Sequence, residues 1–187
     1  MIKLPIWLIV VIVLLVVIVL YFITTKNSLV RAKNRVKEEY SHIDVVLKRR
    51  FDLIPNLVET VKGYAKHEKE TLENIIEARN KYLAAGNPSD AIEANNGLTS
   101  GLTKLFALAE SYPELKSNTN FQELQKELSK TEDQVANART AYNSAVTHFN
   151  NLVEMFPSSI VASMSGYEKE KFFEAPEEEK KNPEIKF

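Results

Sequence analysis

The pair His67-Glu68 is the first feature of the sequence that suggests chemistry, because it reproduces the start of the zinc-protease motif H-E-x-x-H. In that motif a second histidine four positions later completes a metal-binding face on one helix. Here the fourth position is Thr71, and neither His42 nor His148 stands at a ligand-like spacing from another histidine. With no cysteine in the chain either, the sequence predicts no metal site and no bound cofactor.

A serine nucleophile and a nucleotide site have no better support. Ser163 and Ser165 precede Gly166 without the G-x-S-x-G turn or the strand that would expose a nucleophile. None of the 5 glycines forms a G-x-G cluster, and the net charge of -1 argues against nucleic acid as the main partner. We therefore predict that the protein is not an enzyme and does not bind nucleic acid.

Charged residues gather instead around one proline. The residues that we single out as an interaction site or structural joint are Asp44, Lys48, Arg49, Arg50, Asp52, Pro55, Asn56 and Glu59. On a helix, Asp44 can pair with Lys48 at i,i+4, and Asp52 could cap a helix that restarts at Pro55.

Two interpretations of these residues compete. In the functional one, the basic turn binds an acidic partner or a neighbouring subunit. In the structural one, which we favour, Arg50 lies on an apolar row and is held by Asp52, Glu59 or a carboxylate of the last long helix. An arginine on a buried stripe needs a partner before it needs a ligand.

The elements that must position this site begin with residues 4–23, which are apolar except for Pro5. A helix of that length spans about 30 Å, the thickness of the hydrocarbon layer of a bilayer. A secretory signal peptide would have a shorter apolar core and a small-residue cleavage site. We therefore expect a single transmembrane helix at residues 4–23, with the lipid bilayer as a partner.

The cations that flank this span suggest its orientation. Five of them follow within about 15 residues, namely Lys26, Arg31, Lys33, Arg35 and Lys37. By the positive-inside rule, the N-terminus lies outside the cell membrane and the folded part lies in the cytoplasm. In the alternative interpretation these cations are only the solvated face of the next helix.

Periodicity predicts an all-α fold in which the transmembrane helix is followed by an antiparallel up-and-down bundle of about four long helices. The first helix should run to about residue 52, the second to about Ala85 with Gly63 weakening its middle, and the third from Ser89 or Asp90 to about Ser111. The third is the weakest, because Asn95-Asn96-Gly97 and Gly101 interrupt it.

The fourth helix has the clearest pattern, with eleven apolar or small positions at alternating steps of three and four. They are Phe121, Leu124, Leu128, Thr131, Val135, Ala138, Tyr142, Ala145, Phe149, Leu152 and Phe156. A loop is expected from Ser158 to Gly166. The predicted bundle domain covers residues 24–167, and residues 168–187 form a charged, flexible C-terminal tail. Its residues Phe172, Phe173 and Phe187 could dock on another surface.

The segment Ile43 to Arg79, IDVVLKRRFDLIPNLVETVKGYAKHEKETLENIIEAR, resembles the signature of the bacterial LemA family. The similarity extends to Tyr142-Asn143, Phe149-Asn150 and the stretch from Phe156 to Phe173. This resemblance implies a single-pass membrane protein with an antiparallel helical bundle. It also implies magnetosome-associated relatives and links to membrane protease systems, but no secure enzymatic reaction.

We accordingly expect a membrane-anchored interaction or scaffold protein that associates with copies of itself. The long apolar stripe of the fourth helix motivates this, because three shorter helices would leave part of it uncovered. The alternative is an auxiliary factor that recruits partners for a membrane enzyme such as a protease, with the tail as its handle.

Overall fold

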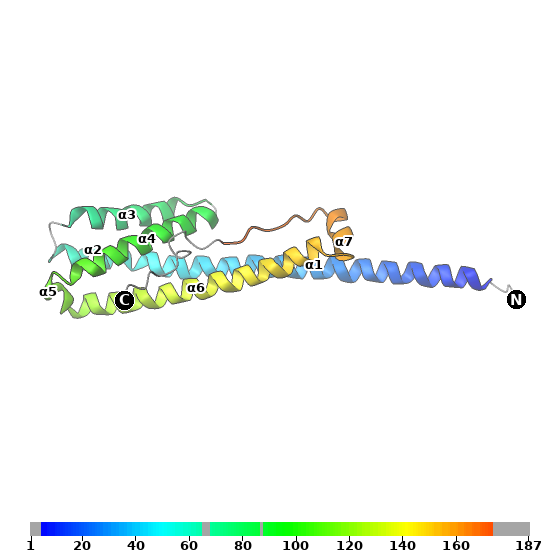
Figure 1. Ribbon diagram of the computed structural model, residues 1–187, viewed down its shortest axis with the longest axis horizontal. Helices are drawn as coiled ribbons and strands as arrows, with labels where there is room; N and C mark the ends of the chain where they lie inside the picture. The colour runs from blue at the N-terminus through cyan, green and yellow to red at the C-terminus, as the bar shows by residue number, and fades with distance from the viewer. Residues whose placement is uncertain (1–4, 65–67, 87, 174–187) are drawn as a thin grey trace, which may run out of the picture. The chain divides into compact units, whose positions relative to one another are not determined.

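The computed structural model describes residues 5–64, 68–86 and 88–173, and every regular element among them is a helix. The helices are α1 (Ile6–Asp52), α2 (Ile54–Lys62), α3 (Lys69–Ala84), α4 (Pro88–Ala109), α5 (Pro113–Lys116), α6 (Thr119–Glu154) and α7 (Ser158–Met164) (Figure 1). The predicted fold class, an apolar N-terminal helix followed by a helical bundle, is confirmed.

Helix α1 joins the apolar segment to the bundle without a break. No glycine or proline occurs between Ile6 and Asp52, so nothing in the sequence interrupts the helix. Among the described residues, it is the one helix long and apolar enough to cross a membrane, and the apolar window is not buried in the chain. Beyond it, Leu29, Val36 and Ile43 are buried as their seven-residue spacing predicts.

The predicted break at Pro55 is confirmed, but the helix that follows is not one piece. Helix α1 ends at Asp52, and α2 begins with Pro55 in its first turn, where the missing N–H has no helical partner to lose. The second predicted helix is divided into α2 and α3, and α2 ends immediately before Gly63.

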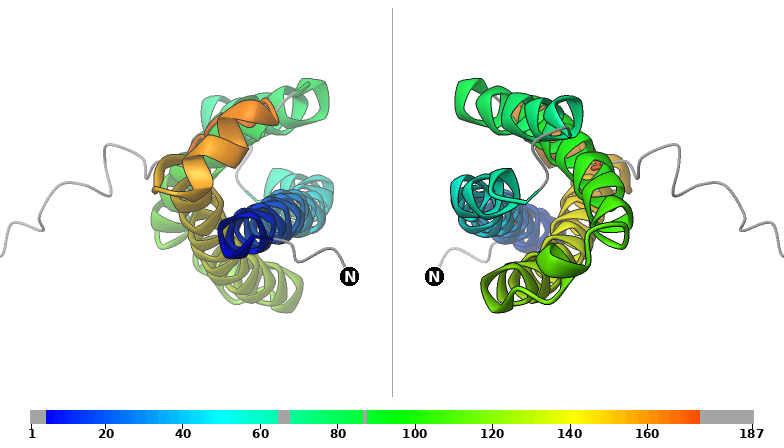
Figure 2. Two further views of the ribbon diagram at one scale, coloured as in Figure 1. Left: turned by 90° about the vertical axis from the view of Figure 1, so that its right-hand side faces the viewer. Right: turned by 90° about the vertical axis from the view of Figure 1, so that its left-hand side faces the viewer.

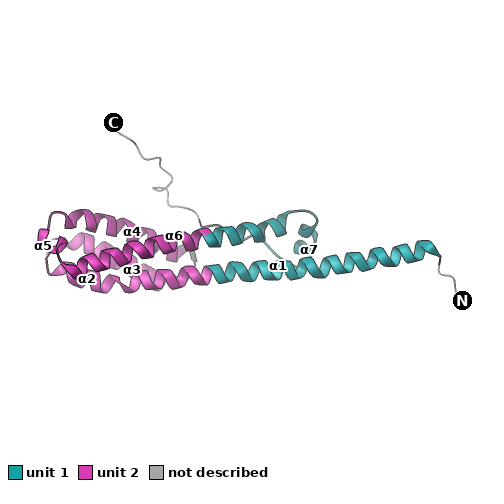
Figure 3. Ribbon diagram, turned by 90° about the horizontal axis from the view of Figure 1, so that it is seen from below, with its two compact units in different colours: residues 1–39, 141–172 teal, residues 40–140, 173–187 magenta. Residues whose placement is uncertain are grey.

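The chain divides into two compact units (Figure 3). Unit 1 contains residues 1–39 and 141–172, and unit 2 contains residues 40–140 and 173–187. Helices α1 and α6 contribute residues to both units.

In unit 2, α3 and α4 lie side by side (Figures 1 and 2). The glycines that were expected to weaken α4 leave it continuous from Pro88 to Ala109. Gly101 is buried, and a Cβ atom there would lie 2.8 Å from Cγ1 of Ile75 on α3. Glycine therefore allows the two helices to approach closely, which offsets its poor helix propensity.

The stripe on α6 is covered within the chain. Eight of its eleven positions are buried, and Leu124 and Leu152 are half-buried. The exception is Phe156, which lies beyond the end of α6 and is 81% exposed. The stripe thus leaves little apolar surface for a second copy of the chain to cover.

Unit 1 differs from the prediction after Pro157. The segment expected to be a loop forms α7, because Ser158–Met164 contains no glycine or proline and buries Val161 and Ala162. The segment that follows is bonded to α6, where the side-chain amide of Asn150 exchanges two hydrogen bonds of 2.9 Å with the backbone of Glu170. Residues 174–187 of the predicted tail, including Phe187, lie outside the described residues.

Candidate functional site

Three consecutive cations lie near the end of α1, and their side chains leave the helix in three directions because successive residues are about 100° apart. Lys48 stays on the surface and donates to Asp52 at 2.7 Å. Arg49 forms an ion pair with Glu127 of α6. Arg50 points into the core and is 2% exposed. The three cations therefore have different environments: Lys48 forms a surface ion pair, Arg49 forms an ion pair between two helices, and Arg50 is buried.

Arg50 is held by two other helices of unit 2. It forms an ion pair with Glu132 of α6, and its Nη1 donates to Oδ1 of Asn95 on α4 at 2.6 Å. Thr99 donates in turn to both carboxylate oxygens of Glu132, at 3.3 and 3.2 Å. Of the three partners considered for Arg50, the carboxylate from the last long helix is confirmed.

The electrostatics of this cluster are dominated by the burial of the Arg50 guanidinium. Burial lowers the pKa of Arg50, while the charge of Glu132 and its hydrogen bond oppose that shift. The Nε atom of Arg50 has no hydrogen-bond partner among the described residues. A buried guanidinium with one ion pair depends strongly on that pair, because removing the carboxylate would leave an uncompensated buried charge.

Asp44 does not form the predicted pair with Lys48, which is bound to Asp52 instead. Its carboxylate accepts a hydrogen bond of 3.3 Å from the hydroxyl of Tyr82 on α3. The Tyr82 ring stacks on Phe51 with the centroids 4.2 Å apart. Burial, followed by the charge and hydrogen bond of Asp44, raises the pKa of Tyr82. The sequence could not anticipate that α3 would bring a hydroxyl to this carboxylate.

Asp52 was also predicted to cap the restarted helix, and this is wrong. It is the last residue of α1, and the position before α2 is taken by Leu53, which makes no side-chain capping bond. Pro55 lies in the first turn of α2 and has no N–H group, so no capping bond is needed there.

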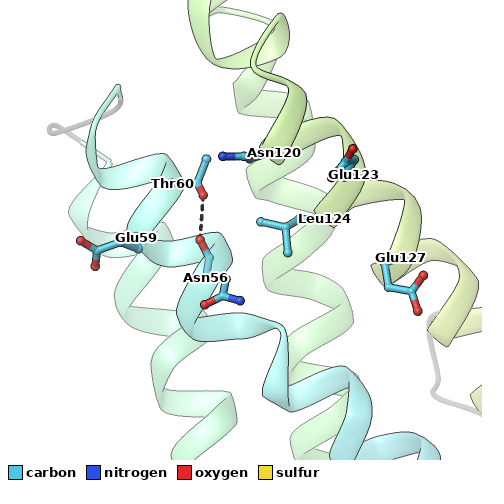
Figure 4. A pocket seen from close by; sticks show the side chains of 7 residues that line it. All are labelled: Asn56, Glu59, Thr60, Asn120, Glu123, Leu124 and Glu127. Carbon is cyan, nitrogen blue, oxygen red and sulfur yellow. Dashed lines mark hydrogen bonds between the residues drawn. The ribbon is translucent and has the colours of Figure 1, made fainter.

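The remaining predicted residues, Asn56 and Glu59, line an open cleft between α2 and α6 (Figure 4). Its volume is about 560 Å³, and its lining residues are Asn56, Glu59, Thr60, Asn120, Glu123, Leu124 and Glu127. Figure 4 shows Leu124 and Asn120 of α6 facing α2, where the Thr60 hydroxyl donates to the backbone carbonyl of Asn56 at 2.8 Å.

The residues that line this cleft carry carboxylates, amides and a hydroxyl beside one leucine. Figure 4 shows the Glu59 side chain on the side of α2 away from Leu124. Only Glu127 has an ion-pair partner among the described residues, Arg49 at the edge of the joint. No group of three His, Cys, Asp or Glu residues within the described chain is arranged to hold a metal ion. The cleft is thus suited to a cationic or hydrogen-bonding segment that stacks an aliphatic stem on Leu124.

The sequence did not predict the residues that complete the Arg50 joint and the cleft between α2 and α6. The sequence predicts Asn95 as an interruption of its helix, but its side chain accepts a buried hydrogen bond from Arg50. A polar residue inside an apolar pattern is also a signal of such a bond. Glu132 adjoins Thr131 of the stripe and could be inferred only as some carboxylate. Nothing in the sequence marked Asn120 or Glu123 as part of a cleft.

Three of the residues considered for catalysis are exposed on separate helices. His42 and His148 are exposed on α1 and α6 and belong to different units. His67 lies outside the described residues. Ser163 is exposed on α7.

Comparison with protein families gives one clear match. The model of the LemA family matches residues 39–187, which include the joint and the cleft.

Individual relatives are more distant. "Protein LemA" of Metamycoplasma hominis is 27% identical over 160 residues, which cover 85% of this chain and 73% of that protein. "Magnetosome protein MamQ 2" of Paramagnetospirillum magneticum is 24% identical over 79% of this chain and 64% of the relative. "Magnetosome protein MamQ" of Magnetospirillum gryphiswaldense is 23% identical over 81% of this chain and 67% of the relative. The chain thus spans about two thirds of the length of the magnetosome relatives.

Proposed function

Because the chain belongs to the LemA family, whose name denotes no reaction, we propose that it is a non-catalytic docking scaffold in a membrane. Helix α1 anchors it, and the cleft between α2 and α6 receives a basic segment of a partner protein. The observation that carries this proposal is the open, acidic and amide-lined cleft beside the fixed Arg50 joint.

The joint supports docking because it holds α6, one wall of the cleft, against the end of α1, which directly precedes α2. Arg50 ties the end of α1 to α4 and α6, and Arg49 ties it to Glu127 in the wall of the cleft. A site whose walls are already ordered loses less conformational entropy when a partner binds.

We place a second copy of the chain first among the partners. Lys126 and Lys130 are exposed on α6, in the same unit as the cleft, and could supply the basic segment. The apolar span itself contains no glycine, alanine, serine or threonine from position 6 to 23, so it lacks the small residues that favour tight helix pairing in lipid. Self-association through charged surfaces outside the membrane is therefore the form that we propose.

The alternative partner is a membrane enzyme such as a protease, for which this protein would be an auxiliary factor. The C-terminal tail was the predicted handle for such a partner. Since Tyr142 and Asn150 are hydrogen-bonded to the backbone of Lys171 and Glu170, a truncation that tests the handle should begin after Phe173. Loss of the partner on this truncation, with the cleft intact, would favour the enzyme-recruiting alternative.

A photo-crosslinking experiment tests the cleft. A photoreactive amino acid is placed at Asn120 in the full chain, irradiated in cells, and compared with the same residue at Glu70 on the exposed face of α3. We expect a discrete adduct from position 120 that weakens severalfold in the Glu59→Gln/Glu123→Gln variant. A matched control, Glu73→Gln/Glu77→Gln, removes two exposed carboxylates of α3 and should leave the adduct unchanged.

The mass of the adduct separates the two partners. Twice the mass of the chain indicates a second copy, and any other discrete mass indicates a different protein. If position 120 gives no adduct, or gives one that the cleft variant does not weaken, the docking proposal is wrong.

A further inference from the structure

The end of α6 and the helix that follows it expose a group of large apolar side chains in unit 1. Its members are Met155, Phe156, Ile160 and Met164, and we call the segment that contains them, Met155–Met164, the α7 corner. Phe156 is 81% exposed, Met164 72% and Ile160 53%. No charged residue occurs from Met155 to Tyr167. An exposed apolar group without interspersed charge marks a surface that meets something other than water.

Helix α7 separates its apolar residues into two faces. Val161 and Ala162 are buried against unit 1. Ile160 and Met164, four positions apart, share another face of the helix and are directed outward. The outward face is thus not needed for the packing of α7, which Val161 and Ala162 already provide.

The α7 corner lies close to the end of the apolar segment of α1. In unit 1, α6 runs antiparallel to α1, and α7 lies near the part of α1 that follows the apolar segment (Figures 1 and 3). Lys33 fixes the register, because it lies over the ring of Phe149 at 5.2 Å and forms an ion pair with Glu170.

The rise per residue of a helix gives the distance between the α7 corner and the end of the apolar span along α1. From Lys33 back to Ile23, the last residue of the apolar segment, is about 15 Å along α1. From Phe149 forward to the end of α6 at Glu154 is about 7.5 Å in the same direction. The corner therefore begins within about 8 Å of the end of the span, a distance similar to the thickness of the headgroup layer.

We propose that the α7 corner is a second membrane contact, which inserts Phe156, Ile160 and Met164 into the interface of the bilayer that α1 crosses. This inference rests on the anchoring part of the proposed function and not on the cleft. Aromatic and aliphatic side chains at the level of the headgroups are stabilised there, as in helices that lie in the membrane surface. Exposed Lys26 and Arg31 on α1 would face the anionic headgroups of the same layer.

Depth-dependent fluorescence quenching tests this contact. The chain has no cysteine, so a single cysteine can carry an environment-sensitive fluorophore without background. We would label Ile160→Cys in the full chain, reconstituted in vesicles of phosphatidylethanolamine and phosphatidylglycerol. Two controls use the same fluorophore: Val19→Cys within the span, and Leu83→Cys, an exposed apolar position of α3 that is 62% exposed.

The label at position 160 should be quenched severalfold more by lipids brominated near the headgroup than by aqueous iodide. The label at position 83 should show the reverse, and the label at position 19 should respond to lipids brominated deep in the chains. A further variant, Phe156→Glu/Met164→Glu, should restore iodide quenching at position 160, whereas Val45→Glu should not.

Each other outcome is decisive. If position 160 is quenched by iodide as strongly as position 83, the second contact does not exist, although quenching at position 19 would still support the anchor. If position 19 is not quenched by lipid, the anchor itself fails. Protection of position 160 from both quenchers would show a protein on this face and would overturn the inference.

Discussion

Arg50 shows how one residue can decide the geometry of a helix joint. Its guanidinium is buried where α1 ends, and its partners come from α4 and α6. The free energy of such a cluster is asymmetric, because an intact buried pair is worth little compared with an apolar replacement, whereas a broken pair is very unfavourable.

This asymmetry gives a testable prediction. Glu132→Gln leaves the charge of Arg50 buried without compensation, and should lower the free energy of unfolding by about 2–3 kcal/mol. This is less than for a fully buried pair, because the Glu132 side chain is 36% exposed. Arg50→Met should be less harmful, since it leaves only a partly solvated carboxylate. Chemical denaturation of the full chain in mild detergent measures both variants.

The test is which of the two variants lowers the free energy of unfolding more. If Arg50→Met destabilises more than Glu132→Gln, Arg50 contributes mainly through packing, and the charge argument is wrong. Lys48→Met, which breaks an exposed pair, is the control and should change stability by less than about 1 kcal/mol.

Tyr82 gives a prediction for alkaline pH. Burial and the nearby Asp44 raise its pKa above the ordinary value of 10.0. Well below that pH the phenol is neutral in both the folded and the unfolded chain, so its contribution to stability is complete. As the pH rises further, the unfolded chain ionises first and the folded state loses stability relative to it.

Tyr82→Phe keeps the stack on Phe51 and removes the ionisable hydroxyl. Thermal melting of the two chains between pH 8 and 11 should therefore show a shallower alkaline loss in the variant. Equal slopes above pH 10 would mean that the tyrosine is not held in its neutral form by the fold.

At the scale of elements, the two glycines of α4 have different roles. A Cβ at Gly101 would meet Cγ1 of Ile75 at 2.8 Å, whereas a Cβ at Gly97 would lie 3.8 Å from that of Ala78. Gly97→Ala should stabilise α4 by up to about 1 kcal/mol, since alanine is the better helix former and the contact is ordinary.

Gly101→Ala gains the same helix propensity but crowds the body of the Ile75 side chain, and we expect a net loss of about 1–2 kcal/mol. Denaturation of the full chain measures both variants side by side. Gly101→Ala combined with Ile75→Val should recover part of the loss. Equal effects of the two alanine substitutions would contradict the close packing of α3 on α4.

These elements also show what the sequence could predict. The end of α1, the break at Pro55 and the stripe of α6 followed from periodicity and proline chemistry, which act locally. The division into α2 and α3, helix α7 and the use of glycine in α4 did not, because they depend on neighbours distant in sequence. In the site, Arg50 was identifiable from its row, but Asn95 and Thr99 were not, since only packing brings them to it.

At the scale of the whole molecule, the apolar span and the first helix of the bundle are parts of one continuous helix, α1. A helix without glycine or proline from Ile6 to Asp52 has no programmed hinge between the span and the residues that bear the joint. The sign of the charges beside the span then becomes important, because these charges decide on which side of the membrane the bundle is exposed.

From the positive-inside rule we predict that the bundle lies in the cytoplasm, and cysteine accessibility tests this prediction. In the full chain, Glu70→Cys on the exposed face of α3 should resist a membrane-impermeant maleimide in cells whose inner membrane is intact, even after any outer barrier is opened. It should react fully once detergent is added. A cysteine inserted after Met1 should show the opposite accessibility, and the absence of native cysteine removes background. Labelling of position 70 in intact cells would mean that the cations after the span serve only as the solvated face of α1.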